Sequence, residues 1–221
     1  MILRPEPGAS ATAERARALG LDPVAMPLFK VESVDWEAPD AGSFDALLLT
    51  SANAVRHAGE ALRSFRQLPV YAVGETTAAA AREAGFDIAG TGDAGAERLL
   101  GSIESGVRLL HLCGEHRTGT PAKQAITAIP VYRSNALPMP GDFGRIAGQV
   151  AAIHSPRAGQ SLAELAERAG IDRSTVRIAA ISGAAAAAAG PGWEQCEAAE
   201  APDEAALLAL AARLCDNRPQ T

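Results

Sequence analysis

Short apolar runs alternate with segments of helical periodicity along the chain. A run that is apolar throughout predicts a strand buried on both faces, as in a parallel sheet covered by helices. Between the runs, apolar residues recur every three or four positions, which predicts helices packed on such a sheet. The pattern therefore predicts an α/β protein. Its strands are expected at 2–3, 24–26, 46–49, 70–73, 109–112, 150–153 and 176–181.

The predicted helices end where the periodicity stops or where glycine follows. Gly20, Gly85 and Gly170 are the expected stops, because glycine readily adopts the left-handed conformation of a helix C-cap. Apolar residues from Ala54 to Phe65 mark one face of a helix, and 117–126 is predicted as another. The other helices are expected at 10–19, 76–84, 96–103, 162–169, 184–189 and 204–214.

The sequence also repeats two of these strand–loop–helix units in the same order and at a nearly constant offset. Such a repeat predicts a duplicated domain, although alanine-rich units of this kind also resemble each other by chance. The matching segments are 44–55 with 149–160, which aligns Ser51 with Ser155, and 69–85 with 176–192, which aligns Gly74 with Ser182.

Composition limits the class of protein. The 221 residues suit one large domain or two small ones, and the aromatic content of 4% predicts a core of Ala, Val, Leu and Ile. The net charge of −6 argues against a general nucleic-acid role, because phosphate binding needs a basic face. Three scattered cysteines, no signal-peptide pattern and no long apolar run predict a soluble, cytoplasmic protein without a membrane segment.

Several segments resemble the uroporphyrinogen-III synthase family, and they follow one another in the order found in that family. They are LRP at 3–5, LLLTSANAV at 47–55, AVGETTAAAAREAG at 72–85, LLHLCGEHR at 109–117, PVYR at 130–133 and IHSP at 153–156. The resemblance implies two flavodoxin-like parallel-sheet domains joined by a two-stranded connector. The first domain would be discontinuous, and the ranges implied are 1–28 with 135–221, 34–129, and the connector 29–33 with 130–134.

The resemblance also implies the reaction. The substrate would be hydroxymethylbilane, a linear tetrapyrrole with acetate and propionate carboxylates, held between two hinged domains. Loss of its terminal hydroxyl, followed by ring closure with inversion of the last pyrrole, gives the III isomer. Closure without the enzyme gives the I isomer, so orientation and preorganised charge should dominate catalysis. A monomer without metal or nucleotide cofactor is expected.

Carboxylates are well suited to loops that lead from a strand into a helix, because the first amides of a helix are unsatisfied. Hydroxyl and amide side chains there either bind the substrate or only cap the helix. The candidates for substrate binding in the first half of the chain are Thr50, Ser51 and Asn53 in one loop and Gly74, Thr76 and Thr77 in the next.

In the second half, Ser155 and Ser182 are the counterparts, and Arg157 and Arg4 are candidate carboxylate partners. An arginine early in a surface helix is more often simply solvated. The second-half loop departs from the family pattern, because 182–185 lacks two of the usual hydroxyls and His154 replaces a threonine.

Residues 111–117 contain two more candidates. Gly114 and Arg117 are expected to contact substrate. His111 and Cys113 share a strand face, but no second ligand pair accompanies them, so a partly buried histidine is favoured over a metal site. The stretch from Arg117 to Tyr132 also leaves little room for a separate strand before Pro130.

Tyr132 resembles the cleft tyrosine of the family and is the candidate catalytic residue. A phenol, with a reference pKa of about 10, is protonated at neutral pH and could assist departure of the hydroxyl. The alternative is a connector tyrosine that packs against Phe29.

Two other functions fit parts of the pattern. A two-domain small-molecule sensor, or an inactive homologue, would show the same alternation and would not need Tyr132. A nucleotide-binding oxidoreductase is disfavoured, because no G-x-G-x-x-G follows the first strand and no Walker A motif is present.

Overall fold

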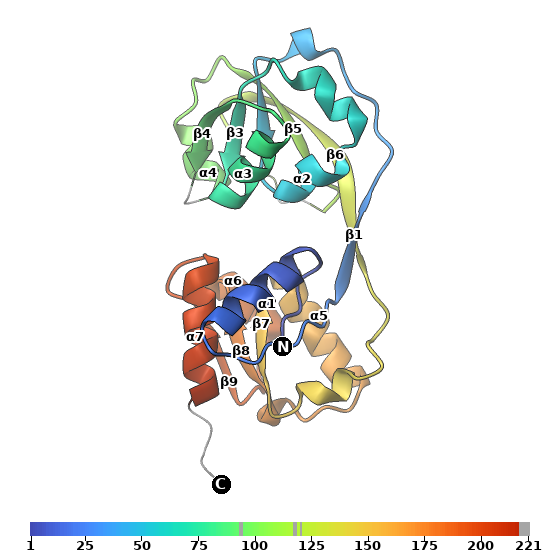
Figure 1. The fold of residues 1–221 in the computed structure, drawn as a ribbon, viewed down its shortest axis with the longest axis vertical. Helices are drawn as coiled ribbons and strands as arrows, with labels where there is room; N and C mark the ends of the chain where they lie inside the picture. The colour runs from blue at the N-terminus through green and yellow to red at the C-terminus, as the bar shows by residue number, and fades with distance from the viewer. Residues whose placement is uncertain (93–94, 117–118, 120, 217–221) are drawn as a thin grey trace. The chain divides into compact units, whose positions relative to one another are not determined.

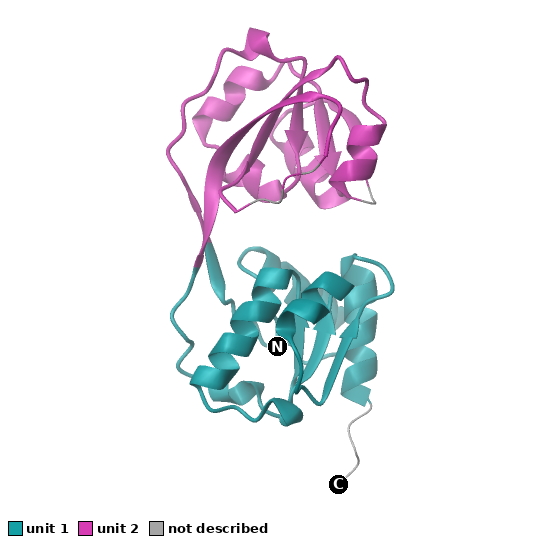
Figure 2. Ribbon diagram, turned by 180° about the vertical axis from the view of Figure 1, so that it is seen from behind, with its two compact units in different colours: residues 1–30, 136–221 teal, residues 31–135 magenta. Residues whose placement is uncertain are grey.

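The computed structural model describes residues 1–92, 95–116, 119 and 121–216. The chain forms two compact units, coloured separately in Figure 2. Unit 1 comprises residues 1–30 and 136–221, and unit 2 comprises 31–135. The predicted α/β class is confirmed, with one sheet of six strands and a separate parallel sheet of three.

The six-stranded sheet has the order β1-β6-β5-β2-β3-β4 (Figure 1). Strands β2 to β6 pair in parallel. The backbone bonds from Val34 N to Val131 O and from Leu137 N to Leu28 O show that β1 and β6 are antiparallel, since the numbers rise on one strand as they fall on the other. The strands are β1 (Phe29–Ser33), β2 (Ala46–Leu49), β3 (Val70–Val73), β4 (Ile88–Gly92), β5 (Arg108–Gly114) and β6 (Ala125–Ala136).

Strand β2 is apolar throughout because both of its faces are covered. Leu47 and Leu49 lie in the core beneath α2 (Ala52–His57) and α3 (Glu75–Glu83). Leu48 lies in the opposite core, where Leu99 and Leu100 of α4 (Ala96–Gly101) pack. Burial on two sides is the reason that this short strand reads as an unbroken hydrophobic run.

Unit 1 repeats this arrangement around its three-stranded sheet. The side chains of Ile153 and Ile178 face the helices α5 (Pro156–Arg168) and α6 (Gly183–Ala189). Val150 and Ala179 face Leu207 and its neighbours on helix α7 (Glu204–Asp216). Ile2 extends the sheet through bridges to Ala25 and Ala152. The elements are α1 (Gly8–Ala18), β7 (Val150–Ile153), α5 (Pro156–Arg168), β8 (Arg177–Ala180), α6 (Gly183–Ala189), β9 (Gln195–Ala198) and α7 (Glu204–Asp216), with short 3₁₀ turns at 41–43, 60–65, 143–146 and 173–175.

Two predicted helices differ in the structure. The helix expected over 117–126 is wrong, because Ala125 already belongs to β6 and residues 121–124 are not helical. Strand β6 is one continuous element that runs through Pro130, so no separate strand precedes that proline. The helix expected from Ala54 to Phe65 is interrupted at Gly59, whose φ of 69° ends α2 before a 3₁₀ turn begins.

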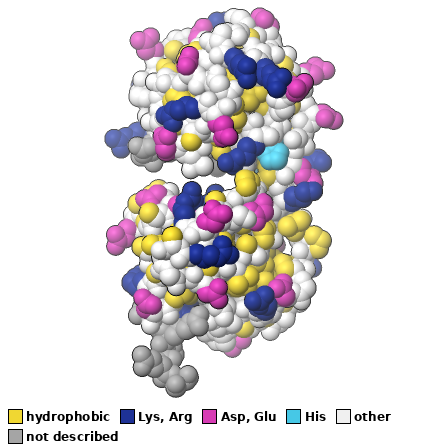
Figure 3. All heavy atoms as spheres, in the orientation of Figure 1, with side chains coloured by type: hydrophobic (Ala, Val, Ile, Leu, Met, Phe, Trp, Pro, Cys, Tyr) yellow, Lys and Arg dark blue, Asp and Glu magenta, His cyan; other side chains and the backbone are white. Residues whose placement is uncertain are grey.

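Figure 3 shows that basic and acidic side chains alternate over the visible face of each unit. Within the described ranges, no helix is long and apolar enough to cross a membrane.

Candidate functional site

The polar loops of unit 2 meet at one edge of its sheet. Thr50 directly follows β2, and Gly74 directly follows β3. Leu49 pairs with Ala72 of β3 and with Leu112 of β5, and all three strands run in the same direction. Their carboxyl ends therefore lie side by side, which is the usual place for a ligand site in a parallel α/β sheet.

Ser51 caps helix α2 and also contacts Tyr132. Its side chain accepts a hydrogen bond of 3.2 Å from Asn53 N, as an N-cap residue should. The Ser51 side chain also lies near the phenol of Tyr132, where its interaction acts to lower the pKa of that phenol. Ser51 is thus an N-cap and a neighbour of the candidate catalytic residue at the same time.

Tyr132 lies on Gly114, its partner in the register of β5 and β6. A Cβ atom at position 114 would stand 2.8 Å from the tyrosine ring, so only glycine leaves room for it. The ring centroid is 6.3 Å from that of His57 at the end of α2. Burial raises the pKa of Tyr132 above its usual value, and this outweighs the opposing effect of Ser51. The phenol is therefore protonated at neutral pH.

Packing of Tyr132 against Phe29, the alternative considered for it, is wrong. Tyr132 packs against the core of unit 2, whereas Phe29 belongs to a core cluster of unit 1. The ring of Phe29 is covered by the guanidinium of Arg157, whose Cζ atom lies 4.6 Å from the ring centroid. Arg157 thus makes a cation–π contact in this structure.

His111 supports the first loop from beneath. Its Nε2 atom lies 3.0 Å from Oγ1 of Thr50, and its side chain is buried in β5. The hydrogen bond fixes the orientation of the Thr50 hydroxyl at the end of β2. Among the residues that the structure describes, no group of three or more His, Cys, Asp or Glu side chains could hold a metal ion.

The second loop differs from the first in how its helix begins. Gly74 has a φ of 80° and supplies no side-chain cap for α3. A Cβ atom there would meet no atom within 4 Å, so the backbone is open to an approaching group. Thr76 is exposed at the first turn, whereas Thr77 is only 4% exposed. Of the two threonines, Thr76 is the one that presents its surface to solvent.

In unit 1, the corresponding serines are occupied as helix caps. Ser155 accepts a hydrogen bond from Ala158 N at 3.2 Å, and Ser182 accepts one from Ala185 N at 3.3 Å. Arg4 donates to Glu204 Oε2 at 2.7 Å. The structure therefore places these candidates in contacts within their own unit. Arg117 lies outside the described residues.

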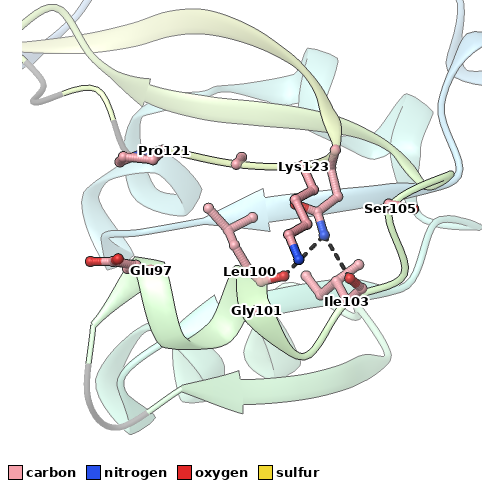
Figure 4. A pocket seen from close by; sticks show the side chains of 9 residues that line it. Glu97, Leu100, Gly101, Ile103, Ser105, Pro121 and Lys123 are labelled. Atoms are coloured by element: carbon pink, nitrogen blue, oxygen red, sulfur yellow. Dashed lines mark hydrogen bonds between the residues drawn. The ribbon is translucent and has the colours of Figure 1, made fainter.

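A pocket of about 580 Å³ lies at the opposite, amino-terminal edge of the sheet of unit 2 (Figure 4). It is lined by α4 and by the segment that leads into β6. Gln124 donates from Nε2 to Leu100 O at 2.9 Å and to Ile103 O at 2.6 Å, which satisfies carbonyls near the end of α4. These contacts stabilise the helix end, and none of the candidate residues that the structure describes lines the pocket.

The sequence did not single out His57 or Glu204. His57 lies four positions after Asn53 on α2, a helical spacing that could have placed it near the same loop. Glu204 contacts Arg4 across 200 positions of sequence, and no local pattern carries such a contact.

Comparison with known proteins agrees with this picture. The family model described as uroporphyrinogen-III synthase HemD matches residues 10–209. A search of the curated proteins found no match.

Two solved structures share the fold at low sequence identity. The uroporphyrinogen-III synthetase from Helicobacter pylori is 18% identical, with a TM-score of 0.62, over 86% of this chain and 92% of that one. A mutant uroporphyrinogen III synthase from Thermus thermophilus is 19% identical, with a TM-score of 0.54, over 99% of this chain and 100% of that one.

Proposed function

Because the chain belongs to the uroporphyrinogen-III synthase family, we propose that Tyr132 and the polar loops of unit 2 act on hydroxymethylbilane. The family match confirms the resemblance seen in the sequence, and with it a lyase that cyclises this tetrapyrrole in haem biosynthesis. The finer proposal concerns which residues take part. The observation that carries it is that Tyr132 is held between Ser51 and Gly114.

Tyr132 would act as the acid that assists departure of the terminal hydroxyl. The Ser51 side chain lies close enough to the phenol to act on its pKa. Ser51 would help to orient the phenol, while its oxygen accepts from Asn53 N. The phenol proton of Tyr132 is then left for the departing hydroxyl, which leaves as water. The cation that remains would lose its pyrrole N–H proton to give the azafulvene, and the tyrosinate would take up a proton again.

The loops would bind substrate carboxylates. The unsatisfied amides at the start of α3 lie next to Gly74, where no side chain competes for them. The hydroxyls of Thr50 and Thr76 would add donors. Ser155, Ser182 and Arg157 remain further candidates in unit 1, although the contacts described above already engage all three.

We also propose the finer features implied by the family. These are two flavodoxin-like domains with a connector formed by β1 and β6, and a cytoplasmic monomer that needs no metal or nucleotide. The antiparallel pairing of β1 with β6 supports a two-stranded connector. The net charge of −6 supports the proposal that the protein has no nucleic-acid partner.

The test is Tyr132→Phe, with Tyr71→Phe as the matched control because Tyr71 is the other tyrosine in the chain. Hydroxymethylbilane is supplied enzymatically, and the rate and the ratio of III to I isomer are measured. A positioned acid typically contributes about a hundredfold or more, but this leaving group departs readily, so we expect a loss of about tenfold to a hundredfold.

Product from Tyr132→Phe should remain mainly the III isomer, because the phenol does not set how the last pyrrole turns. Tyr71→Phe should keep the full rate, since Tyr71 packs against the core beside α4. An unchanged rate in Tyr132→Phe would remove Tyr132 from the mechanism.

A further inference from the structure

A carboxylate of the protein itself is bound at the carboxyl edge of the sheet of unit 1. Glu204, the first residue of α7, points toward α1 and toward the loop after β7. Arg4 donates from Nη1 to its Oε2 atom at 2.7 Å, and the hydroxyl of Thr12 donates to its Oε1 atom. Arg4 Nη1 also lies 3.3 Å from Thr12 Oγ1, so the two donors are joined to each other.

His154 completes the surroundings of this carboxylate. Its Nε2 atom is 3.6 Å from Glu204 Oε2, which is longer than a hydrogen bond, so we regard Arg4 and Thr12 as the donors. Burial lowers the pKa of His154, so the ring is neutral at pH 7. Arg15 lies farther out, with Nη1 at 3.9 Å from Oε1.

The side chains around Glu204 are held in place by the fold of unit 1 itself. Thr12 is fully buried, and the side chain of His154 is only 9% exposed. Gly8 leaves room for Arg4 at the start of α1, because a Cβ atom there would stand 2.6 Å from Arg4 Nε. Arg4, Thr12 and His154 come from separate segments and converge on one carboxylate. Such an arrangement is a preorganised site and differs from an isolated ion pair on the surface.

The position of the cluster matches that of the polar loops in unit 2. His154 directly follows β7, as Thr50 directly follows β2. Arg4 follows Ile2, which bridges to Ala152 of β7. The side chain of glutamate is itself a CH₂–CH₂–COO⁻ arm, with the same atoms as a propionate substituent.

We propose that Arg4, Thr12 and His154 form a carboxylate-binding site in unit 1, sized for an acetate or propionate arm, and that Glu204 is its resident occupant. Arg4, expected from the sequence to bind substrate, then meets a substrate carboxylate only in exchange for Glu204. The ionised state of the occupant agrees with this. Burial alone would raise the pKa of Glu204, but its interactions with His154, Thr12 and Arg4 lower it to about 2.

The alternative is an ion pair that only ties α1 to α7. A carboxylate-binding site should take up a free carboxylate, saturably and in preference to chloride, when its resident one is removed, and the KM measurement below separates substrate binding from an ion pair between the two helices. Glu204→Ala removes the equivalent of acetate while leaving Cβ in place. Acetate added to this variant should therefore refill the site.

The experiment measures the melting temperature of the full chain in increasing sodium acetate, with sodium chloride at equal ionic strength as the reference. Glu204→Ala should melt about 3 to 8 °C below wild type, given that about 1 kcal/mol shifts the midpoint of a chain this long by about 2 to 4 °C. Acetate should restore a large part of that loss, and the restoration should saturate.

Two control variants make the result specific. Glu197→Ala breaks the Arg213 pair, which spans 2.6 Å but is more than a third exposed on both sides, and acetate should not stabilise it beyond chloride. Arg4→Ala combined with Glu204→Ala lacks the main donor and should not respond either. Equal responses of Glu204→Ala and Glu197→Ala to acetate would overturn the site.

If Glu204→Ala does not fold without added anion, refolding yield replaces melting temperature as the measurement. A yield that rises and saturates with acetate, but not with chloride, supports the site, and a yield indifferent to acetate overturns it. Neither measurement depends on turnover, so a failure of the carboxylate site can be told apart from a failure of the proposed function. Only one part of the inference rests on the proposed function, namely that the substrate is a source of the carboxylate.

The KM for hydroxymethylbilane separates the two sources of carboxylate. If the site binds an arm of the substrate, Glu204→Ala should have a lower KM, because the arm no longer competes with Glu204. Added acetate should then raise the KM again. Thermal rescue by acetate with an unchanged KM assigns the site to free carboxylates of the same size.

Discussion

In unit 2 the polar side chains at the carboxyl edge of the sheet face open loops, whereas in unit 1 the same edge is already filled. Ser51 and Ser155 occupy matching places after β2 and β7, and both cap the following helix. Ser51 also interacts with Tyr132. In unit 1, a neighbouring carboxylate from Glu204 takes the available donors of that edge instead.

The next loop along each sheet shows the same contrast. Helix α3 begins after Gly74 with no side-chain cap, and its first turn carries Thr76. Helix α6 begins after Ser182, which caps it, and continues as an unbroken alanine run. In α3 the amide of Thr77 donates to Gly74 O at 3.1 Å, and in α6 the amide of Ala185 donates to the Ser182 hydroxyl at 3.3 Å. The first two amides are left in both helices, and the difference is that no side chain covers them at Gly74.

The matched loops of the two units therefore differ in where their polar groups find partners. Ser51 and Ser155 keep the same cap, which stability requires, whereas the side chains beside them make different contacts. Substitutions at matched positions in the two copies should then separate stability from activity.

The largest effect is expected from Gly114→Ala in unit 2, compared with Gly183→Ala in unit 1. A Cβ atom at 114 would stand 2.8 Å from the Tyr132 ring, whereas one at 183 would meet nothing within 4 Å. Displacement of Tyr132 should lower kcat by about tenfold to a hundredfold, as loss of a positioned acid does. Overpacking should also cost about 1 to 3 kcal/mol of stability.

Gly183→Ala should retain full activity and gain up to about 1 kcal/mol, because alanine favours a helix over glycine. Initial rates and urea unfolding of both variants provide the measurement. A Gly114→Ala enzyme with the wild-type rate would show that the position of Tyr132 does not matter.

The next effect concerns acid. The pKa of Glu204 is about 2 in the folded protein, below its ordinary value of 4.5. Between these values the unfolded chain binds more protons, so the contribution of Glu204 is complete above pH 4.5 and is lost as the pH falls toward 2. The loss is about 3 kcal/mol at most, and Glu204→Gln should remove this part of the pH dependence.

Unit 2 offers the matched comparison. Asp45 also has a pKa lowered to about 2, mainly by its hydrogen bonds with Arg108, but the side chains of Arg108 and Asp45 are 49% and 43% exposed. The contribution of Asp45 should fade in high salt, whereas that of Glu204, whose side chain is 22% exposed, should persist. Urea unfolding at pH 7 and pH 3, with and without salt, tests both. A Glu204 contribution that disappears in salt would mean that its surroundings are as open as those of Asp45.

The sequence predicted the buried strands more accurately than anything else. The runs at 46–49, 70–73 and 150–153 have the bounds of β2, β3 and β7, because a strand covered on both faces must be apolar throughout. The failure at 117–126 has a physical reason. Ile126, Thr127 and Ile129 are β-branched residues that favour a strand, and tertiary pairing with β5 extends that strand through Pro130.

The candidate site was predictable where it depends on local order and not where it depends on contacts distant in sequence. Thr50, Ser51 and Gly74 lie at strand ends, which the apolar runs locate. The contact between Thr50 and His111 joins two neighbouring strands, and the strand order was needed to see it. The contact between Arg4 and Glu204 depends on the packing of the two ends of the chain. The sequence does not reveal this contact, so it predicts that Arg4 binds a substrate carboxylate.

The smallest effect is expected from the paired caps, Ser51→Ala and Ser155→Ala. Each change removes one side-chain bond to a helix amide, at 3.2 Å in both cases, so each should cost about 1 kcal/mol of stability.

Only Ser51→Ala also removes an interaction with Tyr132. The phenol pKa should rise further and its orientation should loosen, so this variant should lose about threefold to tenfold in rate, which corresponds to about 1 kcal/mol. Ser155→Ala, which leaves the surroundings of Tyr132 unchanged, should lose less rate than Ser51→Ala while melting at the same lowered temperature. Equal rates in two variants of equal stability would mean that the Ser51 bond serves the helix alone, and the distinction between the two units would then rest on Gly114 and Glu204.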